Sequence, residues 1–393
     1  MRSCLTARAL CKIVSLGAAG VFCAPAAEGG QVVIAPGHGE QFVGSAGCKS
    51  SSCHGGAGEK RSQYITWSQQ DFHTRAYPVL VNARSARMAE TLHLGAATST
   101  SRCTICHSPF QTVDASHLTD AARGDQGVSC ESCHNAASSW FRGHTRPDWT
   151  YAMRVTAGMR DLRNFYVRAN TCVACHQNVD SDLLAAGHPP LRFELDGQSV
   201  AEPKHWQDPP GSGAKAWLVG QAVALREMSW ALSSAANPDP ELVGRWNGLV
   251  WLLSKATAQA GVGGIDAPGP PYTHAVFIDM QERADTLARR SADASLASDF
   301  ARTTFQTLTI TTTEFRNSGQ SHDVLFWRAE RLVPALNRLA VASGADSDSS
   351  PKPEGRALFE AIQNPAAFDP VRFAKAVEAY GGSTSSSTPG AGP

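Results

Sequence analysis

Four stretches of the chain place two cysteines shortly before a histidine. Three of them have two residues between the cysteines and the histidine directly after the second: Cys103–His107, Cys130–His134 and Cys172–His176. In the fourth, Cys48–His54, four residues separate the cysteines. CxxCH is the attachment sequence of c-type haem: each cysteine forms a thioether with a vinyl group, and the histidine binds the iron.

The sequence therefore predicts four covalently bound haem c groups. The eight predicted attachment residues are Cys48, Cys53, Cys103, Cys106, Cys130, Cys133, Cys172 and Cys175. The four predicted proximal iron ligands are His54, His107, His134 and His176.

Zinc binding, a redox-active dithiol and a disulfide are the other common uses of paired cysteines. Zinc-binding CxxC pairs do not need a histidine directly after every second cysteine. A thioredoxin-like dithiol normally occurs once, near a βαβ pattern, and the sequence shows no such pattern. The recurring histidine favours haem for the three regular motifs, while Cys48–His54 departs from the usual spacing.

The N-terminus has the features of an export signal. Residues 1–12 carry three basic residues and no acid, and residues 13–24 are apolar but too short to span a membrane. Small residues suitable for cleavage follow at 24–27. We therefore expect a signal peptide over residues 1–27 and a periplasmic protein. An ordinary buried N-terminal helix fits the basic start less well.

The cysteine count agrees with export. The chain has 11 cysteines, and those outside the four motifs are Cys4, Cys11 and Cys23, all within the expected signal. After cleavage, every remaining cysteine would belong to a haem motif. A lipoprotein anchor at Cys23 is disfavoured by the bulky Phe22 before it.

The remainder of the chain divides by composition, and its 393 residues leave room for two domains. We expect a mostly α fold with few strands: a multihaem cytochrome c domain followed by a C-terminal α-helical bundle. The expected parts are an N-terminal segment over residues 28–42 with strand-forming Val32–Ile34, a tetrahaem domain over 43–206, a linker over 207–213, a helical domain without haem over 214–381 and a disordered tail over 382–393.

Apolar residues at helical spacing predict the bundle. Stripes run through residues 218–232, 242–256 and 325–339, and the second opens with Asp239 as N-cap before Pro240. One or two further helices are expected within 274–318, and a last one from Asp369–Pro370. The helices expected in the haem domain cover 61–77, 78–94 and the region around 159–169.

Each haem iron has a second axial position opposite its motif histidine. A second histidine there gives a closed electron carrier, whereas an open position permits ligand binding or chemistry. The candidates for four positions are His38, His73, His93, His117, His144, His188 and His205. Loop or surface roles are favoured for His38, His93 and His117.

The stretch Gly127–His134, together with Trp67 shortly before His73, resembles the tetrahaem cytochrome c-554 family (the cytochrome c-552/4 domain). The resemblance covers roughly residues 43–206 and rests on the order of the haem motifs and histidines. From the positions of the histidines relative to the motifs, the resemblance implies which histidine is the distal ligand of each haem. The implied pairs of motif and distal histidines are His134 with His73, His54 with His144, His176 with His205 and His107 with His188, and the last two distal residues are interchangeable.

We therefore expect an exported tetrahaem c-type cytochrome that relays electrons between redox partner proteins in the periplasm. One-electron transfer needs no catalytic acid or base, so no catalytic residue is assigned. Two alternatives stay open. One is an oxidoreductase acting on a small nitrogen or sulfur species at a five-coordinate haem on His107, because the second haem of the family's best-known member is five-coordinate. The other is a binding module in which the C-terminal helices dock a redox partner.

Charge and hydropathy exclude other partners. Lys and Arg together number 35, as do Asp and Glu, so no net charge favours nucleic acid or an anionic membrane. No apolar run after the signal is long enough for a transmembrane segment in the mature chain.

Overall fold

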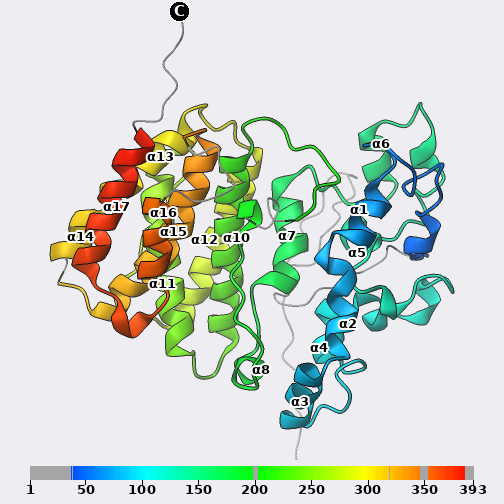
Figure 1. The fold of residues 1–393 in the computed structure, drawn as a ribbon, viewed down its shortest axis with the longest axis horizontal. Coiled ribbons are helices and arrows are strands. Elements are labelled where there is room, and N and C mark those ends of the chain that lie inside the picture. The colour runs from blue at the N-terminus through cyan, green and yellow to red at the C-terminus, as the bar shows by residue number, and fades with distance from the viewer. Residues whose placement is uncertain (1–36, 38, 198–201, 318, 346–352, 386–393) are drawn as a thin grey trace, which may run out of the picture.

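The computed structural model describes residues 37, 39–197, 202–317, 319–345 and 353–385 (Figure 1). The expected signal peptide, the strand at Val32–Ile34, and His38 lie outside the described residues. The described part of the chain is helical, with no strand and one isolated parallel bridge between Phe42 and Leu118. The mostly α fold is confirmed.

The first half of the chain consists of short helices joined by loops. They are η1 (Ser45–Gly47), α1 (Gln63–Gln69), η2 (Phe72–Arg75), α2 (Ala76–Leu80), α3 (Ala83–Thr91), α4 (Ser101–His107), η3 (Pro109–Thr112), η4 (Ala115–His117), η5 (Gly124–Gln126), α5 (Cys130–His134), η6 (Gly143–Thr145), α6 (Tyr151–Thr156), α7 (Phe165–His176) and α8 (Ser181–Ala185).

Side-chain caps break the longer helices that the sequence suggested here. The expected helix over 61–77 is interrupted at Asp71, whose carboxylate accepts a hydrogen bond from the His73 backbone N–H. The expected helix over 78–94 is interrupted at Asn82, which caps α3 in the same way. Such caps satisfy N–H groups that a new helix would leave unpaired. The short pieces can therefore change direction between the haem motifs.

The second half is a bundle of longer helices. They are α10 (Gly213–Ser234), α11 (Pro240–Ala256), η7 (Thr257–Gln259), α12 (His274–Asp293), α13 (Phe300–Thr309), α14 (Thr312–Asn317), α15 (His322–Ala342), α16 (Pro353–Ala361), η8 (Pro365–Ala367) and α17 (Pro370–Ser385). The three apolar stripes lie on α10, α11 and α15, as predicted, and Asp239 caps α11. Helix α16 was not predicted, and α17 runs to Ser385, into the segment expected to be a disordered tail.

One apolar core joins the fourth haem motif to the bundle. Phe165, Ala169 and Val173 of α7 are buried in the same cluster as the apolar faces of α10 to α17. Figure 1 shows α7 between the bundle and the short helices, and it packs against α10 and α12. The core therefore does not end at the expected linker over 207–213, because the helix that carries Cys172–His176 belongs to it.

Hydrogen bonds reinforce this junction. The Tyr166 hydroxyl of α7 donates to Asp285 Oδ1 of α12 at 2.6 Å, and Arg226 Nη1 of α10 donates to the same oxygen at 2.8 Å. Arg226 Nη2 also donates to Asn170 Oδ1 of α7 at 2.6 Å. Because Arg226 is largely buried, these contacts hold α7 in one orientation on the bundle.

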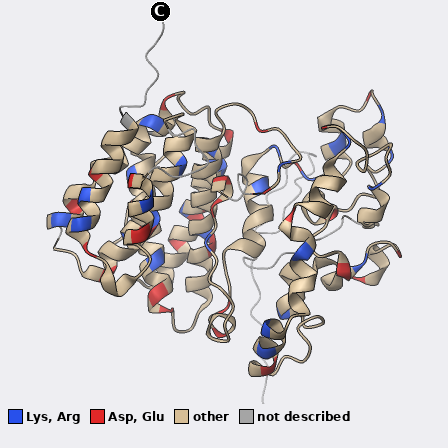
Figure 2. Ribbon diagram, in the orientation of Figure 1, with Lys and Arg blue, Asp and Glu red and all other residues tan. Residues whose placement is uncertain are grey.

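The charged residues show no segregation by sign. Figure 2 shows basic and acidic residues interspersed along the helices of both halves. No helix in the described residues combines the length and the apolar character needed to cross a bilayer.

Candidate haem sites

The structure places eight histidine rings in four opposed pairs, each with one motif histidine and one distal candidate. The distances between ring centroids are 6.1 Å for His54 and His144, 6.0 Å for His176 and His73, 6.4 Å for His107 and His188, and 6.4 Å for His134 and His205. A metal–imidazole bond is about 2.0–2.1 Å and a ring nitrogen lies roughly 1.1 Å from the ring centre, so two imidazoles on one metal ion have centres about 6.3 Å apart. The observed spacing fits one iron ion between the rings of every pair.

Two of these pairs differ from the pairs that the resemblance implied. His73 faces His176 and not His134, while His205 faces His134 and not His176. The backbone N–H of Val128 donates to the His73 carbonyl at 3.1 Å, so His73 does lie beside the third motif. Its ring points elsewhere because Asp71 holds Nδ1 at 3.0 Å.

The other two pairs have the expected members. His144 follows Trp140 on the chain and its ring lies nearly parallel to that of His54, with an interplanar angle of 15°. His188 faces His107 across an interplanar angle of 71°. Ligation of iron by any of these residues stays a prediction, since the observation concerns the placement of the rings.

The cysteines of different motifs lie next to one another. The eight motif cysteines are half-buried, and no disulfide joins any of them in the described part of the chain. The neighbouring Cys130 lowers the pKa of Cys48, and the neighbouring Cys175 lowers the pKa of Cys106. Burial raises the pKa of Cys172 above its usual range, and the neighbouring Cys133 adds to this rise. The four sites therefore follow one another in space in the order first, third, fourth and second motif.

Burial keeps the central imidazoles neutral. It lowers the pKa of His134 to about 4, and the nearby His205, Arg160, His54 and His144 add to the effect. It also lowers the pKa of His176 to about 4. A neutral imidazole is the form that binds a metal ion, so both rings are in the required state at neutral pH.

The second ring nitrogen of several paired histidines has an acceptor nearby. The Nδ1 contacts are His54 with Gln63 Oε1 at 2.9 Å, His107 with the Ala76 carbonyl at 3.0 Å, His144 with the Trp140 carbonyl at 3.3 Å, His188 with the Pro189 carbonyl at 2.8 Å and His73 with Asp71 Oδ1 at 3.0 Å. An acceptor at Nδ1 places the ring proton there and leaves Nε2 for iron.

Sequence reasoning missed these supporting residues. Gln63 carries no motif signal. Asp71 could have been found as an N-cap residue two positions before a candidate ligand. Its carboxylate is buried, and although burial alone would raise the pKa of Asp71, the hydrogen bonds from His73 outweigh it and lower that pKa.

The glutamate inside the third motif has a structural role. Glu131 is buried and accepts hydrogen bonds from the backbone N–H groups of Val43, Gly44 and Ala137 at 3.0, 2.8 and 2.8 Å. Burial raises the pKa of Glu131 despite these contacts. The side chain thereby anchors the segment before the first motif to helix α5.

One arginine connects the third and fourth motifs. Arg160 Nη1 donates to the carbonyls of Ser132 and Cys133 at 3.0 and 3.2 Å and lies 3.5 Å from Thr171 Oγ1 of α7. Carbonyls at the end of a short helix otherwise lack donors. Arg160 therefore fixes the spacing between two predicted haem sites.

A cavity of about 590 Å³ lies beside the second motif. Its lining residues are Leu80, Val81, Ala86, Ala89, Glu90, His93, Gly95, Ala96, Ala97 and Thr98. Cys103 packs against the same apolar cluster of Leu80, Ala89 and Ala97. A mostly apolar space of this size beside an attachment cysteine fits part of a porphyrin.

The histidines for which loop or surface roles were favoured stand apart from the pairs. His93 is exposed in the cavity lining, in the left-handed region with φ of 55°. His117 Nδ1 contacts the Glu40 carbonyl at 2.7 Å, which ties η4 to the N-terminal segment. Neither ring opposes a motif histidine among the described residues.

Part of the chain matches a known protein family. Residues 47–135 match the family model described as cytochrome c554 and c-prime. The match contains the first three cysteine motifs but covers less than a quarter of the chain, and the fourth motif and the bundle lie outside it. Comparison with curated proteins and with solved structures gave no match. Residues 47–135 are therefore similar to cytochrome c554 and c-prime, and this similarity supports covalently bound haem c and a role in electron transfer.

Proposed function

We propose that the chain is an exported tetrahaem c-type cytochrome that relays electrons between redox partner proteins in the periplasm. The observation that carries the proposal is the set of four opposed histidine pairs, each beside two cysteine thiols. Bound haem iron supplies a reversible one-electron change. The chain supplies two axial imidazoles and two thioether positions for each of the four groups.

The order of the sites in space supports a relay. Cys48 of the first motif lies beside Cys130 of the third, Cys106 of the second motif lies beside Cys175 of the fourth, and the third and fourth motifs are joined through Arg160. A continuous row of this kind lets an electron pass between neighbours without crossing long stretches of protein. The two ends of this row of sites are those of Cys48–His54 and Cys103–His107, and partner proteins would exchange electrons there.

The second imidazole at every site favours a carrier over an enzyme. An enzyme acting on a small nitrogen or sulfur species would need an open axial position. His188 stands opposite His107, the site that the resemblance left open, at the same spacing as the other pairs. The geometry therefore supports closed coordination at all four haems.

Export is supported by two independent features of the sequence. The first 27 residues have a basic start, an apolar stretch and small residues for cleavage. In addition, covalent attachment of haem to the two cysteines of each motif requires that the chain be exported to the compartment where this attachment takes place. The N-terminal sequence of the mature protein from the periplasmic fraction tests this part directly, and a mature chain starting at Met1 would contradict it.

Haem number and coordination test the core of the proposal. We expect a mass increase corresponding to four haems, and a spectrum in which every haem is low-spin. A mass corresponding to three haems, with free thiols at Cys48 and Cys53, would remove the stretched motif from the assignment. A high-spin haem in the unmodified protein that binds carbon monoxide would instead favour the enzyme.

Single substitutions test which rings form pairs. His205→Ala should make the haem on His134 high-spin, and His73→Ala should make the haem on His176 high-spin, each converting about a quarter of the total haem. His93→Ala is the matched control, because this ring is exposed and opposes no motif histidine. Conversion of the His134 haem by His73→Ala would restore the pairing that the family resemblance implied.

A further inference from the structure

Among the described residues, one paired histidine has a carboxylate at its second ring nitrogen. Nδ1 of His73 lies 3.0 Å from Asp71 Oδ1. The corresponding acceptors of His54, His107, His144 and His188 are an amide oxygen or backbone carbonyls, all uncharged. The site formed by His73 and His176 is therefore electrostatically different from its neighbours.

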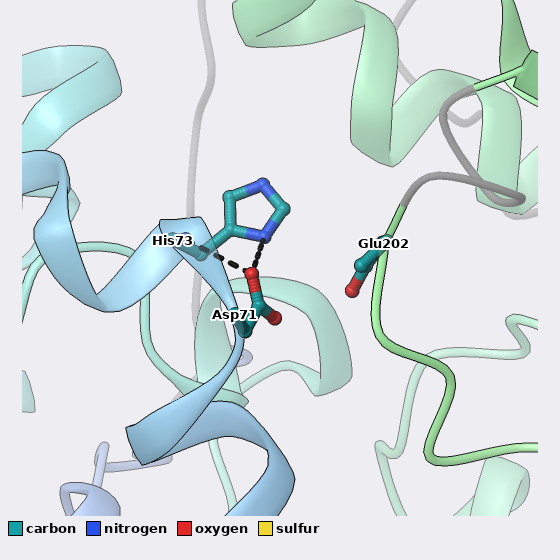
Figure 3. A group of neighbouring side chains, drawn as sticks. All are labelled: Asp71, His73 and Glu202. Carbon is teal, nitrogen blue, oxygen red and sulfur yellow. Dashed lines mark hydrogen bonds and ion pairs between the residues drawn. The ribbon is translucent and has the colours of Figure 1, made fainter.

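The carboxylate is held firmly in place. Asp71 is the N-cap of η2, and its Oδ1 accepts from both the backbone N–H of His73, at 2.9 Å, and the ring. The side chain is only 4% exposed, so water does not compete for the contact. Figure 3 shows the Glu202 side chain extending from a neighbouring segment towards Asp71 and His73, and ligand atoms of Asp71, His73 and Glu202 all lie within 4.8 Å of one another.

A carboxylate acceptor changes what an imidazole does to its metal. By accepting the Nδ1 proton in a charge-assisted hydrogen bond, it increases the electron density on the ring and makes Nε2 a stronger donor. A stronger donor stabilises the oxidised, more positively charged iron over the reduced form. Hydrogen bonding to an axial ligand is one of the levers by which a protein sets the potential of a haem.

We propose that Asp71 is a positioning residue that lowers the reduction potential of the haem held between His73 and His176. The inference rests on the proposed assignment of four haems with paired histidine ligands. It makes the fourth site harder to reduce than an otherwise equal site with an uncharged acceptor. The fourth site lies between the third and the second in the row. Asp71 therefore sets the difference in reduction potential between an internal site of the relay and its neighbours.

Asp71→Asn tests the proposal with little structural change, because asparagine is as good an N-cap as aspartate. In a potentiometric titration of the haem-loaded protein we expect one of the four reduction steps to become about tenfold more favourable, a rise of about 59 mV for a one-electron couple. The other three steps should move much less. Asp71→Glu, which keeps the carboxylate, should stay closer to the unmodified protein.

Asp114→Asn is the matched control for loss of a charge. Asp114 also caps a short helix, η4, through the N–H of Ser116, but it is exposed and precedes the unpaired His117. We expect this variant to leave all four potentials nearly unchanged. A similar rise of one step in Asp114→Asn would show that the effect of Asp71 is not specific to its histidine.

Gln63→Glu is the reciprocal test at another site. The His54 ring already contacts Gln63 Oε1 at 2.9 Å, so the substitution places a carboxylate at the same nitrogen. We expect a different reduction step to fall by a comparable amount. The proposal is overturned if Asp71→Asn leaves every step in place with four low-spin haems intact, or if Gln63→Glu raises its step. A missing haem or a high-spin haem in the unmodified protein would instead contradict the proposed function.

Discussion

Replacing Phe165 by alanine should destabilise the bundle and the fourth haem site together. The phenyl ring lies in the core shared by α7 and the bundle and is 7% exposed, and the Arg168 guanidinium lies 5.0 Å from its centre. Truncating a buried phenylalanine to alanine costs about 3–5 kcal/mol, through lost burial and the cavity left behind. For a chain of this size a loss of that magnitude lowers the unfolding midpoint by about 4–6 °C.

The measurement is thermal unfolding of the haem-loaded protein, followed by far-ultraviolet circular dichroism and by Soret absorbance at one scan rate. Helix content reports mainly on the bundle and Soret absorbance on the haem sites, so a shared core predicts that both midpoints fall together. Ile310→Ala is the control, because Ile310 is 72% exposed in the bundle and its loss should change stability by no more than about 0.5 kcal/mol. A fall of the helix midpoint with an unchanged Soret midpoint would show that the two halves unfold independently, as the expected linker over 207–213 implied.

Three further predictions follow from the haem sites. Because burial lowers the pKa of His134 and His176 to about 4, their neutral form contributes stability that is present above the unfolded pKa of about 6.5 and is lost as pH falls; since an iron bound at the ring competes with the proton, an acid titration should show low-spin haem giving way to high-spin haem only below about pH 4. Arg102→Gln removes the contacts of 2.6–2.7 Å that tie α4 to the start of α8, the helix shortly before His188, and since such exposed pairs contribute up to about 1 kcal/mol, carbon monoxide binding at the His107 haem should rise by no more than about fivefold. Glu131→Gln weakens three buried backbone contacts and should cost about 1–3 kcal/mol in chemical denaturation, while keeping four haems by mass.

Local patterns in the sequence predict the elements of this fold. The apolar stripes and the Asp239–Pro240 start predict the main bundle helices, because a helix that buries one face must repeat apolar residues at that spacing. Helices in the haem half were predicted too long. Asp71 and Asn82 read as ordinary polar positions in a helical pattern, whereas in the structure their side chains start new helices.

The boundary between the halves was not predictable from local patterns. Phe165, Ala169 and Val173 form a short apolar stripe inside a haem motif helix, and the sequence assigns that helix to the haem half. Only the three-dimensional arrangement shows that this stripe completes the core against α10 and α12. A motif fixes the chemistry of a segment, but the apolar surface fixes where the segment packs.

The exchange of two histidine pairs has the same origin. Proximity of His73 to the third motif is correct at the level of the backbone, since its carbonyl accepts from Val128. Which haem iron the His73 ring can bind depends on the orientation of the ring. Asp71, two residues earlier in the chain, sets that orientation through its contact with Nδ1. His205 takes the position opposite His134. If Asp71 both orients the His73 ring towards His176 and sets the reduction potential of the haem between them, one side chain determines both which histidines pair and how easily that haem is reduced. Asp71→Asn should separate these two effects, since the amide oxygen of asparagine can still accept from the His73 backbone N–H and from Nδ1 of the ring, while the charge at that nitrogen is removed.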